Sequence, residues 1–449
     1  MKRKLLSFVS VVIAMLTLAS VSLIPASTIN YTNGIKLKSK SALVINLDTG
    51  QTVFSVKAKE KRYPASTTKI MTYIVVAENV DDFENTKVKI KKDVLSILDG
   101  TGSSVANVEA HVGEKMSVLD LLYSMMVPSG NDAAVVLADY IGKGDINALV
   151  EMMNAKAKEL GCKNTHFANP DGLHDKNHYT TAEDLAKITQ YALTLPEFST
   201  ITNTATYYVK DDDNPLVTTN YMIDENRGGD YYYQYAQGIK TGTTDEAGHC
   251  LVTMGSADGY TYLAVLLMNP IKDPDEYGTM IDAADLFRWA LTKLELNQVA
   301  SSETPVCEVK VNLAWGKDSV QLVPERNINA IVPTDYNKND IIIETDVPQS
   351  VDASIKKGDV IGKATVYYKG DQAKGKQKID TVNLVSSETI ERSGILHIAS
   401  VIKNIVSSGW FLLVIAAIIV LLIAYIIISV MIKKRNRNRR KHVRKYRNF

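Results

Sequence analysis

The sequence predicts an α/β protein in which helices sandwich one sheet, followed by a small all-β domain and one C-terminal transmembrane helix. Apolar strand-like runs stand at both ends of a helix-rich region, an arrangement typical of a sheet covered by helices. After Ser301, short strand-like runs separated by turn residues replace the helical patterns, and an uncharged apolar run lies near the C-terminus. The chain of 449 residues, 45% of them hydrophobic and 22% charged, is long enough for two or three folded domains.

The N-terminus has the composition of a secretory signal peptide. Basic residues at positions 2–4 precede an apolar stretch at 5–24, and a small-residue segment follows at 25–28. We expect residues 1–26 to be removed by cleavage after Ala26, and residues 27–40 to form a linker. Because the apolar stretch is long, an uncleaved transmembrane helix is the alternative.

A second apolar segment, residues 410–432, is uncharged and long enough to cross a bilayer. A buried core helix of this length would normally carry a polar face, and this segment shows almost none. The tail at 433–449 contains four Lys, six Arg and no acid, so it should remain cytoplasmic. We expect a single-pass protein of the cell membrane whose folded domains are extracytoplasmic. A basic tail directly after a membrane span indicates contact with lipid, and we expect no nucleic-acid partner.

The first exported domain is predicted at 41–297. Two strands at 41–46 and 52–56 flank the hairpin turn signal Asp48-Thr49-Gly50. Helical patterns follow from Ser66, from near Ser117, and from Thr181, each of which suits a helix start. The remaining predicted elements are helices at 133–141 and 146–160, strands at 250–254 and 261–268, and a last helix at about 275–296.

The second exported domain is predicted at 298–385 as a small β-rich domain. Its strand-like runs lie at 308–313, 319–323, 341–345 and 363–368. A helix-prone polar stretch at about 386–408 then leads to the membrane, so we expect residues 386–409 to form a membrane-proximal stalk.

The cysteines and histidines do not predict a metal centre. The three cysteines are widely spaced, so we expect three small buried residues, with one disulfide as the alternative. His174 and His178 lie near two aspartates, a set that could suggest a metal site, but loop-packing histidines are the preferred interpretation. No cofactor or metal is expected. The cysteines are Cys162, Cys250 and Cys307.

The chemistry of the first domain depends on three short motifs. The S-x-x-K at 66–69 begins a predicted helix, where the spacing places Ser66 and Lys69 on one face. A serine becomes a good nucleophile when a base removes its proton, and a lysine whose pKa is lowered by burial or a nearby cation can be that base. The same pattern recurs at Ser354 and Ser400 outside this domain, so an isolated match is weak evidence.

The other two motifs follow in chain order. The S-x-N at 129–131 lies between two predicted helices, where a second hydroxyl and an amide can face a cleft. The K-T-G at 240–242 precedes the strand pair, and a strand edge with a cation and hydroxyls suits a carboxylate. S-x-x-K, S-x-N and K-T-G in this order form the pattern of β-lactamases and penicillin-binding proteins.

With these motifs the chain resembles the low-molecular-mass penicillin-binding proteins, the serine-type D-Ala-D-Ala carboxypeptidases. The resemblance covers about residues 41–385, and it implies a β-lactamase/transpeptidase-like sheet followed by the family's small C-terminal domain. It also implies removal of the terminal D-alanine from peptidoglycan stem peptides through an acyl-enzyme, with β-lactams as inhibitors. The segments that carry it are 63–72, 127–134, 154–173, 179–185 and 356–362.

The resemblance also implies a role for each motif residue. An acylated serine, its lysine base and a proton-relaying serine would be the catalytic residues Ser66, Lys69 and Ser129. The substrate amide and terminal carboxylate would be held by Asn131, Lys240, Thr241, Gly242 and Thr243, with the glycine permitting close approach. Backbone N–H groups of Ser66 and Thr243 would form the oxyanion hole.

One departure from the family and three rival functions bear on this hypothesis. Family members carry a carboxylate-binding arginine after the strand pair, and residues 255–286 contain none. A β-lactamase would need a deacylating glutamate at about 164–173, and that segment has no Glu. A β-lactam receptor without turnover is disfavoured by the short tail. A cross-linking transpeptidase or an endopeptidase remains an alternative.

Overall fold

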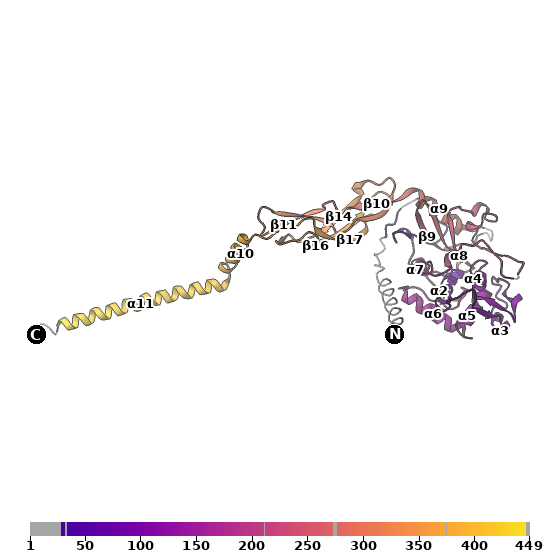
Figure 1. Ribbon diagram of the computed structural model, residues 1–449, viewed down its shortest axis with the longest axis horizontal. Helices are drawn as coiled ribbons and strands as arrows, with labels where there is room; N and C mark the ends of the chain where they lie inside the picture. The colour runs from indigo at the N-terminus through magenta and orange to yellow at the C-terminus, as the bar shows by residue number, and fades with distance from the viewer. Residues whose placement is uncertain (1–27, 32–33, 211, 273–275, 374, 446–449) are drawn as a thin grey trace, which may run out of the picture. The chain divides into compact units, whose positions relative to one another are not determined.

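The computed structural model describes residues 28–31, 34–210, 212–272, 276–373 and 375–445 (Figure 1). The predicted signal peptide, residues 1–26, lies outside the described residues. By its internal contacts the chain forms two compact units. The first unit comprises Met1–Ala300, Ile328–Glu344 and Thr365–Asp380, and the second comprises Ser301–Asn327, Thr345–Ala364 and Thr381–Phe449.

The first unit is built on a five-stranded antiparallel sheet with the strand order β2-β1-β9-β8-β7. The two strands predicted at 41–46 and 52–56 are confirmed with the same bounds. The edge strand β7 carries the K-T-G motif, so its outer side is available to a ligand. The strands are β1 (Ser41–Asn46), β2 (Thr52–Val56), β7 (Ala236–Thr244), β8 (Gly248–Ala257) and β9 (Tyr260–Asn269).

Helices cover both faces of this sheet, as predicted. In β9, alternate residues such as Leu263 and Val265 belong to the large apolar cluster that includes α7 (Ala182–Ala192). The opposite face meets α9 (Gly278–Lys293): a Cβ built on Gly255 of β8 would lie 2.6 Å from the ring of Phe287. Two covered faces explain why β8 and β9 are almost wholly buried and apolar.

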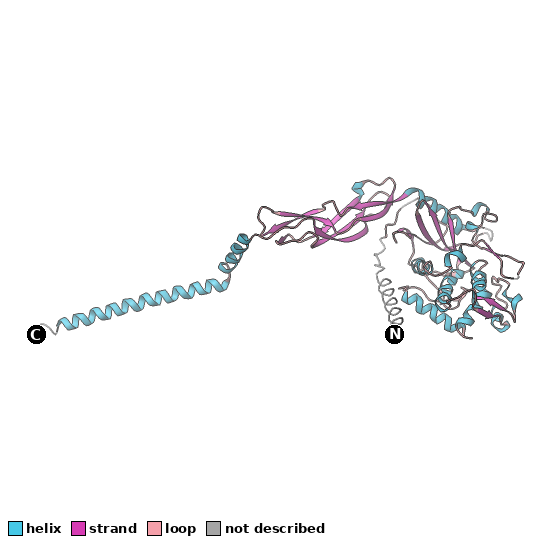
Figure 2. Ribbon diagram, in the orientation of Figure 1, coloured by secondary structure: helices cyan, strands magenta, loops and turns pink. Residues whose placement is uncertain are grey.

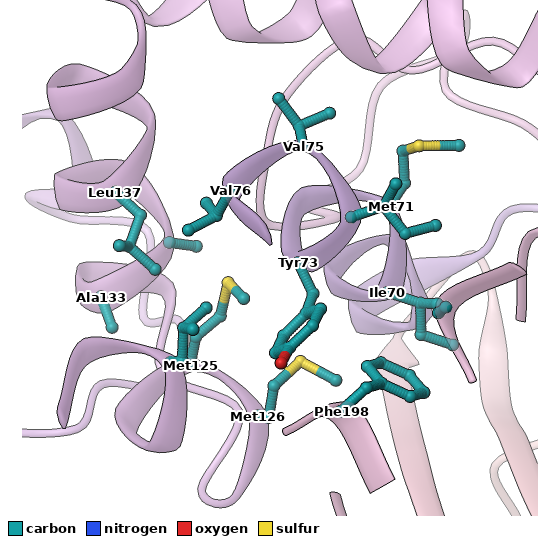
Figure 3. Packing of buried hydrophobic residues seen from close by; sticks show 14 of the residues in the cluster. Ile70, Met71, Tyr73, Val75, Val76, Met125, Met126, Ala133, Leu137 and Phe198 are labelled. Carbon is teal, nitrogen blue, oxygen red and sulfur yellow. The ribbon is translucent and has the colours of Figure 1, made fainter. Parts of the chain in front are cut away.

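The central helix of the first unit is α2 (Lys69–Asn79). Every residue from Lys69 to Val76 is buried, which is typical of a helix surrounded by other elements. Figure 3 shows Tyr73 of this helix beside Met126 and Phe198; the Tyr73 and Phe198 rings meet edge to face with centroids 4.9 Å apart. This packing fixes the helix end at which Ser66 and Lys69 lie.

Helices around α2 complete the first unit, and those that follow Ser117 and Thr181 begin where the sequence predicts. Ser117 accepts a hydrogen bond from the Asp120 backbone N at 2.9 Å, and Thr181 accepts one from Asp184 N at 3.0 Å, so both residues cap helices. The other helices are α3 (Lys92–Leu95), α4 (Val118–Met126), α5 (Asn131–Ile141), α6 (Ile146–Glu159) and α8 (Phe198–Thr202). Short strand pairs are β3 (Lys87–Lys89) with β4 (Lys115–Ser117) and β5 (Thr206–Tyr207) with β6 (Leu216–Val217).

Between α9 and α10 the chain forms a β-rich region, as predicted, and Figure 2 draws this region mostly as strands. A six-stranded sheet has the order β14-β16-β17-β12-β11-β15. Its strands are β11 (Cys307–Asn312), β12 (Ser319–Pro324), β14 (Ile341–Asp346), β15 (Ser350–Asp352), β16 (Val360–Tyr368) and β17 (Gln377–Ser386). A separate pair joins β10 (Leu294–Ala300) and β13 (Ile328–Pro333).

Two sequence predictions about this region are wrong. The helix expected to reach residue 296 ends at Lys293, because Leu294 begins β10 and pairs with Pro333 of β13. The stretch before the membrane is not polar: α10 (Gly394–Val406) exposes Ile395, Ile398 and Ile402. The three cysteines are free; Cys162 and Cys250 are buried as expected, and Cys307 is only partly buried.

The last helix, α11 (Gly409–Lys445), contains the predicted membrane segment. Its stretch Gly409–Arg437 is the one helix among the described residues that is long and apolar enough to cross a bilayer. None of its apolar window is buried against the rest of the protein, which fits a helix that anchors the chain in a membrane.

Candidate active site

The serine of the S-x-x-K motif lies on a short 3₁₀ turn, η1 (Ala65–Thr68), that leads into α2. Two neighbouring hydroxyls are used internally: Thr67 donates to the Pro64 carbonyl at 2.7 Å and Thr68 donates to the Ala65 carbonyl at 2.8 Å. Ala65, Thr67 and Thr68 are buried, whereas Ser66 is partly exposed. The turn therefore presents one hydroxyl to a ligand.

Lys69 is completely buried and contacts that hydroxyl. Its Nζ donates to Ser66 Oγ at 2.9 Å, to Asn131 Oδ1 at 2.6 Å and to the Asp171 carbonyl at 2.7 Å. Burial lowers the pKa of Lys69 to about 8, although the Asp171 and Asp132 carboxylates oppose the shift. A lysine with this pKa can lose its proton near neutral pH and accept one from the serine.

Of the two causes that the sequence analysis offered for a lowered lysine pKa, burial is the main one at Lys69. Lys240 is only 1% exposed, and its own pKa lies well below the usual value because of burial and then the charge of Lys69. The two lysines are therefore both buried at this site, and burial lowers the pKa of each.

The S-x-N motif forms the turn between α4 and α5, as expected from the sequence. Ser129 adopts a left-handed φ of 68° and is 6% exposed. Asn131 begins α5 and directs its carbonyl oxygen to Lys69. Asp132 anchors the turn by accepting hydrogen bonds from the backbone N of Ala106 and Val108 at 2.9 and 3.0 Å. Burial raises the pKa of Asp132.

The K-T-G strand passes directly against the nucleophile turn. A Cβ built on Gly242 would lie 2.8 Å from Ser66 N and 3.0 Å from the Pro64 carbonyl oxygen, so only glycine fits there. Thr241 shares a hydrogen bond with Thr219 at 2.5 Å, and Thr243 shares one with Nδ1 of His249 at 2.9 Å.

The loop that contains Pro170 and Gly172 packs against α2 and the nucleophile turn η1. The Pro170 carbonyl accepts from Thr72 Oγ1 at 2.5 Å, and Gly172, with φ of +92°, approaches Ala65 so closely that a Cβ would lie 2.0 Å from its carbonyl oxygen. His178 accepts from the Ala168 backbone N, contacts Thr68 Oγ1 at 2.7 Å, and has a pKa lowered to about 4 by burial. His178 therefore packs this loop as a neutral side chain, as the preferred interpretation of the sequence holds.

These elements enclose one cavity of about 350 Å³. It brings together five predicted site residues, while three more (Lys69, Asn131 and Lys240) are buried around it. The sequence interpretation included neither Arg227 nor His249 among the site residues, and both line the cavity. Their residue types suit a site that binds a carboxylate, but no spacing pattern marks them. The five predicted residues are Ser66, Ser129, Thr241, Gly242 and Thr243.

Ser66 is partly exposed and forms a hydrogen bond with the buried Lys69, and Gly242 of β7 lies against it. This arrangement on an α/β domain defines a serine enzyme that catalyses acyl transfer. A family model described as D-alanyl-D-alanine carboxypeptidase matches residues 28–270, and one described as penicillin-binding protein 5, C-terminal domain, matches residues 295–392. The chain therefore belongs to the D-alanyl-D-alanine carboxypeptidase family of low-molecular-mass penicillin-binding proteins. This membership confirms the resemblance derived from the motifs.

Individual relatives agree with the family. D-alanyl-D-alanine carboxypeptidase DacF of Bacillus subtilis is 29% identical over 76% of this chain and 84% of its own length. A D-alanyl-D-alanine endopeptidase of Pseudomonas aeruginosa is 31% identical over 67% of this chain and 91% of its own length. The crystal structure of carboxypeptidase DacD from Francisella tularensis superposes with a TM-score of 0.64 at 27% identity, over 84% of this chain and 98% of that one.

Proposed function

We propose that this chain is a serine-type D-Ala-D-Ala carboxypeptidase that removes the terminal D-alanine of peptidoglycan stem peptides. Family membership supports the activity, and one contact carries it to this chain: the hydrogen bond from buried Lys69 to Ser66 Oγ at 2.9 Å. The cavity beside that contact has about 350 Å³, room for a peptide end and not for a folded protein.

Acylation would begin when neutral Lys69 takes the proton of Ser66. The Ser66 oxygen attacks the carbonyl carbon of the penultimate D-alanine, and the backbone N–H groups of Ser66 and Thr243 stabilise the oxyanion. Collapse of this intermediate breaks the peptide C–N bond. The leaving D-alanine takes a proton that Lys69 supplies through the Ser129 hydroxyl, which leaves Lys69 neutral again.

Deacylation would run the same path with water in place of the amine. Lys69 removes a proton from water, the hydroxide attacks the ester carbonyl, and Ser66 leaves with its proton restored. Asn131 holds the substrate amide and keeps Lys69 oriented through its 2.6 Å contact. Lys240, Thr241 and Thr243 hold the terminal carboxylate, and Gly242 lets β7 pass close to Ser66. A β-lactam acylates Ser66 in the same way, but the amine formed when its ring opens stays attached to the acyl group and does not leave.

Endopeptidase activity is the second candidate, because the relative in Pseudomonas aeruginosa carries that name at 31% identity. Product analysis separates the two. A stem pentapeptide incubated with the enzyme should yield free D-alanine and a tetrapeptide. Cleavage of a purified cross-linked dimer with no release from the pentapeptide would favour the endopeptidase, and a new cross-linked product would favour a transpeptidase. The Ser66→Ala variant controls for contaminating peptidases.

We propose in addition that residues 410–432 anchor the chain as a single membrane span. The apolar character of Gly409–Arg437 supports this proposal, and the basic residues that follow support a cytoplasmic C-terminus. The catalytic domain at 41–297, the β-rich domain at 298–385 and the stalk at 386–409 would then lie outside the cell, next to their peptidoglycan substrate.

A further inference from the structure

The β-rich domain exposes a tryptophan that is not part of its core. Trp315 lies in the loop between β11 and β12, residues 313–318, and is 75% exposed. Among the described residues outside α10 and α11, no large hydrophobic side chain is more exposed. An indole combines a large apolar ring with one N–H donor, which suits a boundary between an apolar phase and water. The Trp315 loop is therefore a candidate contact surface.

This loop is hydrogen-bonded to the chain segment that leads to the last two helices. The Ser393 backbone N donates to the Leu313 carbonyl at 2.8 Å. Next to this bond, Ala314 forms an antiparallel bridge with Arg392. Trp315 is two residues from Leu313, and two residues span at most about 7 Å. Because Ser393 is the N-cap of α10, the position of Trp315 is tied to the start of that helix.

The helix α10 has one apolar face. Four isoleucines recur at spacings of three and four residues, which places them on one side of the helix, and each is more than half exposed. His397, Ser400 and Asn404 share the opposite side by the same spacing. An amphipathic helix of this kind lies along a membrane surface with its apolar face in the lipid. The isoleucines are Ile395, Ile398, Ile402 and Ile405.

The other end of α10 leads directly to the proposed membrane span. Only Ser407 and Ser408 separate α10 from α11, whose apolar stretch Gly409–Arg437 is not buried against the protein. With this stretch in the bilayer, the C-terminal end of α10 is at the membrane surface. The helix has 13 residues, a length of about 20 Å, and both ends of a helix that lies along the surface are at one depth. Ser393 and the Trp315 loop are therefore at the level of the lipid headgroups.

The Trp315 loop has no net charge. It contains one basic and one acidic residue, Lys317 and Asp318. Lys317 Nζ also lies 3.0 Å from both carboxylate oxygens of Glu388, which lies in the segment before α10. Contact of this loop with lipid depends on the apolar ring and not on anionic headgroups. Zwitterionic phosphatidylcholine is therefore a sufficient test surface.

We propose that Trp315 inserts into the headgroup region of the bilayer, so that the β-rich domain contacts lipid through the Trp315 loop in addition to the membrane span. The inference rests on the proposed membrane span. The partner is a lipid surface, recognised by an indole ring beside an apolar helix face that leads into the span. The loop and the span tie this end of the β-rich domain to the bilayer at two points, which restricts the tilt of the domain.

Quenching by brominated lipid tests this contact in the full-length chain. The chain has three tryptophans, and Trp410→Phe removes the one at the start of the membrane span. The protein is incorporated into phosphatidylcholine nanodiscs with and without bromine on the acyl chains. Brominated lipid should quench about half of the Trp315 emission, because an interfacial ring reaches the boundary between headgroups and acyl chains. The double variant Trp315→Phe/Trp410→Phe keeps only Trp289, which is 9% exposed, and should lose no emission.

A tryptophan at the opposite end of β11 is the matched control. Glu303 is exposed and precedes β11, which begins at Cys307, whereas the Trp315 loop follows the last residue of β11. Glu303→Trp in the double variant should not be quenched. Equal quenching at both positions, or no quenching at Trp315, would overturn the proposal. A blue shift of Trp315 emission without quenching would mean that protein, such as a second copy of this chain, covers the ring, and this result would overturn it as well.

Extraction with alkaline carbonate separates this proposal from the membrane span on which it rests. Wild-type protein that resists extraction while Trp315 is unquenched would overturn the loop contact and keep the span. Protein that carbonate releases would refute the span, and quenching of Trp315 before extraction would still support contact of the loop with lipid. Trp315→Phe should be labelled by a β-lactam at the wild-type rate, which shows that the loop variant is folded.

Discussion

At the scale of single residues, burial sets the chemistry of Lys69. An ammonium group with no exposed surface loses the hydration that favours its charge, and two carboxylates recover only part of it. The three oxygen atoms around Nζ suit the protonated form, and losing that proton leaves one lone pair for the Ser66 hydroxyl. The same side chain can therefore accept and return a proton during one turnover.

Replacement of Lys69 by arginine tests its role as the base. Lys69→Arg keeps the positive charge, but a guanidinium does not deprotonate in a protein. We expect the second-order rate constant for acylation by a β-lactam to fall by at least about 100-fold, the lower end for the loss of a general base. Near-normal acylation of this variant would exclude the role. Circular dichroism establishes that the variant is folded.

The pH dependence of acylation follows from the same group. Lys69 acts as a base only when neutral, and its pKa is lowered to about 8. The acylation rate constant should therefore fall about tenfold per unit as the pH drops below about 8, and level off above it. Stopped-flow measurements with a chromogenic β-lactam between pH 5 and 10 give the profile. A flat profile would contradict a lysine base.

At the scale of elements, the site depends on one strand lying against one turn. β7 passes η1 at Gly242, where a Cβ would come within 2.8 Å of Ser66 N. Gly242→Ala should displace strand or turn, and a shift of this size can cost about 100-fold in acylation. Gly394→Ala, where nothing lies within 4 Å of the added Cβ, is the control and should acylate normally. Equal rates for both variants would mean that the close approach is not needed.

Elements with local signals could be predicted from the sequence. Asp48-Thr49-Gly50 marks a hairpin, and Ser117 and Thr181 are caps whose side chains bond the first turn of their helices. Elements set by distant partners were missed. Leu294 continues a helical pattern, yet β10 pairs with β13 more than thirty residues later in the chain. The segment of α10 was expected to be polar because of its polar residues, although the helix exposes several isoleucines.

The same distinction holds in the site. Ser66 and Lys69 are three residues apart on one helix end, so their contact could be predicted. Arg227 and His249 reach the cavity from a loop and from β8, and nothing in the sequence near either residue indicates that they line the same cavity. Asp171 contributes a backbone carbonyl to Lys69, which no side-chain pattern reveals.

At the scale of the whole molecule, we expect the described catalytic residues to work without the membrane segment. A chain truncated after Ser393 lacks α10, which exposes isoleucines, and α11. It should be soluble and fully active, whereas the full-length chain should require detergent for extraction. In intact protoplasts, an external protease should remove the catalytic domain and spare a tag after Phe449. Loss of that tag would refute the proposed orientation.

The central claim is that Ser66 is the acylated residue, and one measurement tests it most directly. The truncated enzyme is labelled with a β-lactam, digested and mapped by mass spectrometry, with the Ser66→Ala variant in parallel. The sequence offers two other S-x-x-K serines, Ser354 in the β-rich region and Ser400 in α10 of the full-length chain. We predict one adduct, on Ser66, and none in the variant. An adduct on Ser354 or on Ser400 of the full-length chain, or undiminished labelling of Ser66→Ala, would contradict the account.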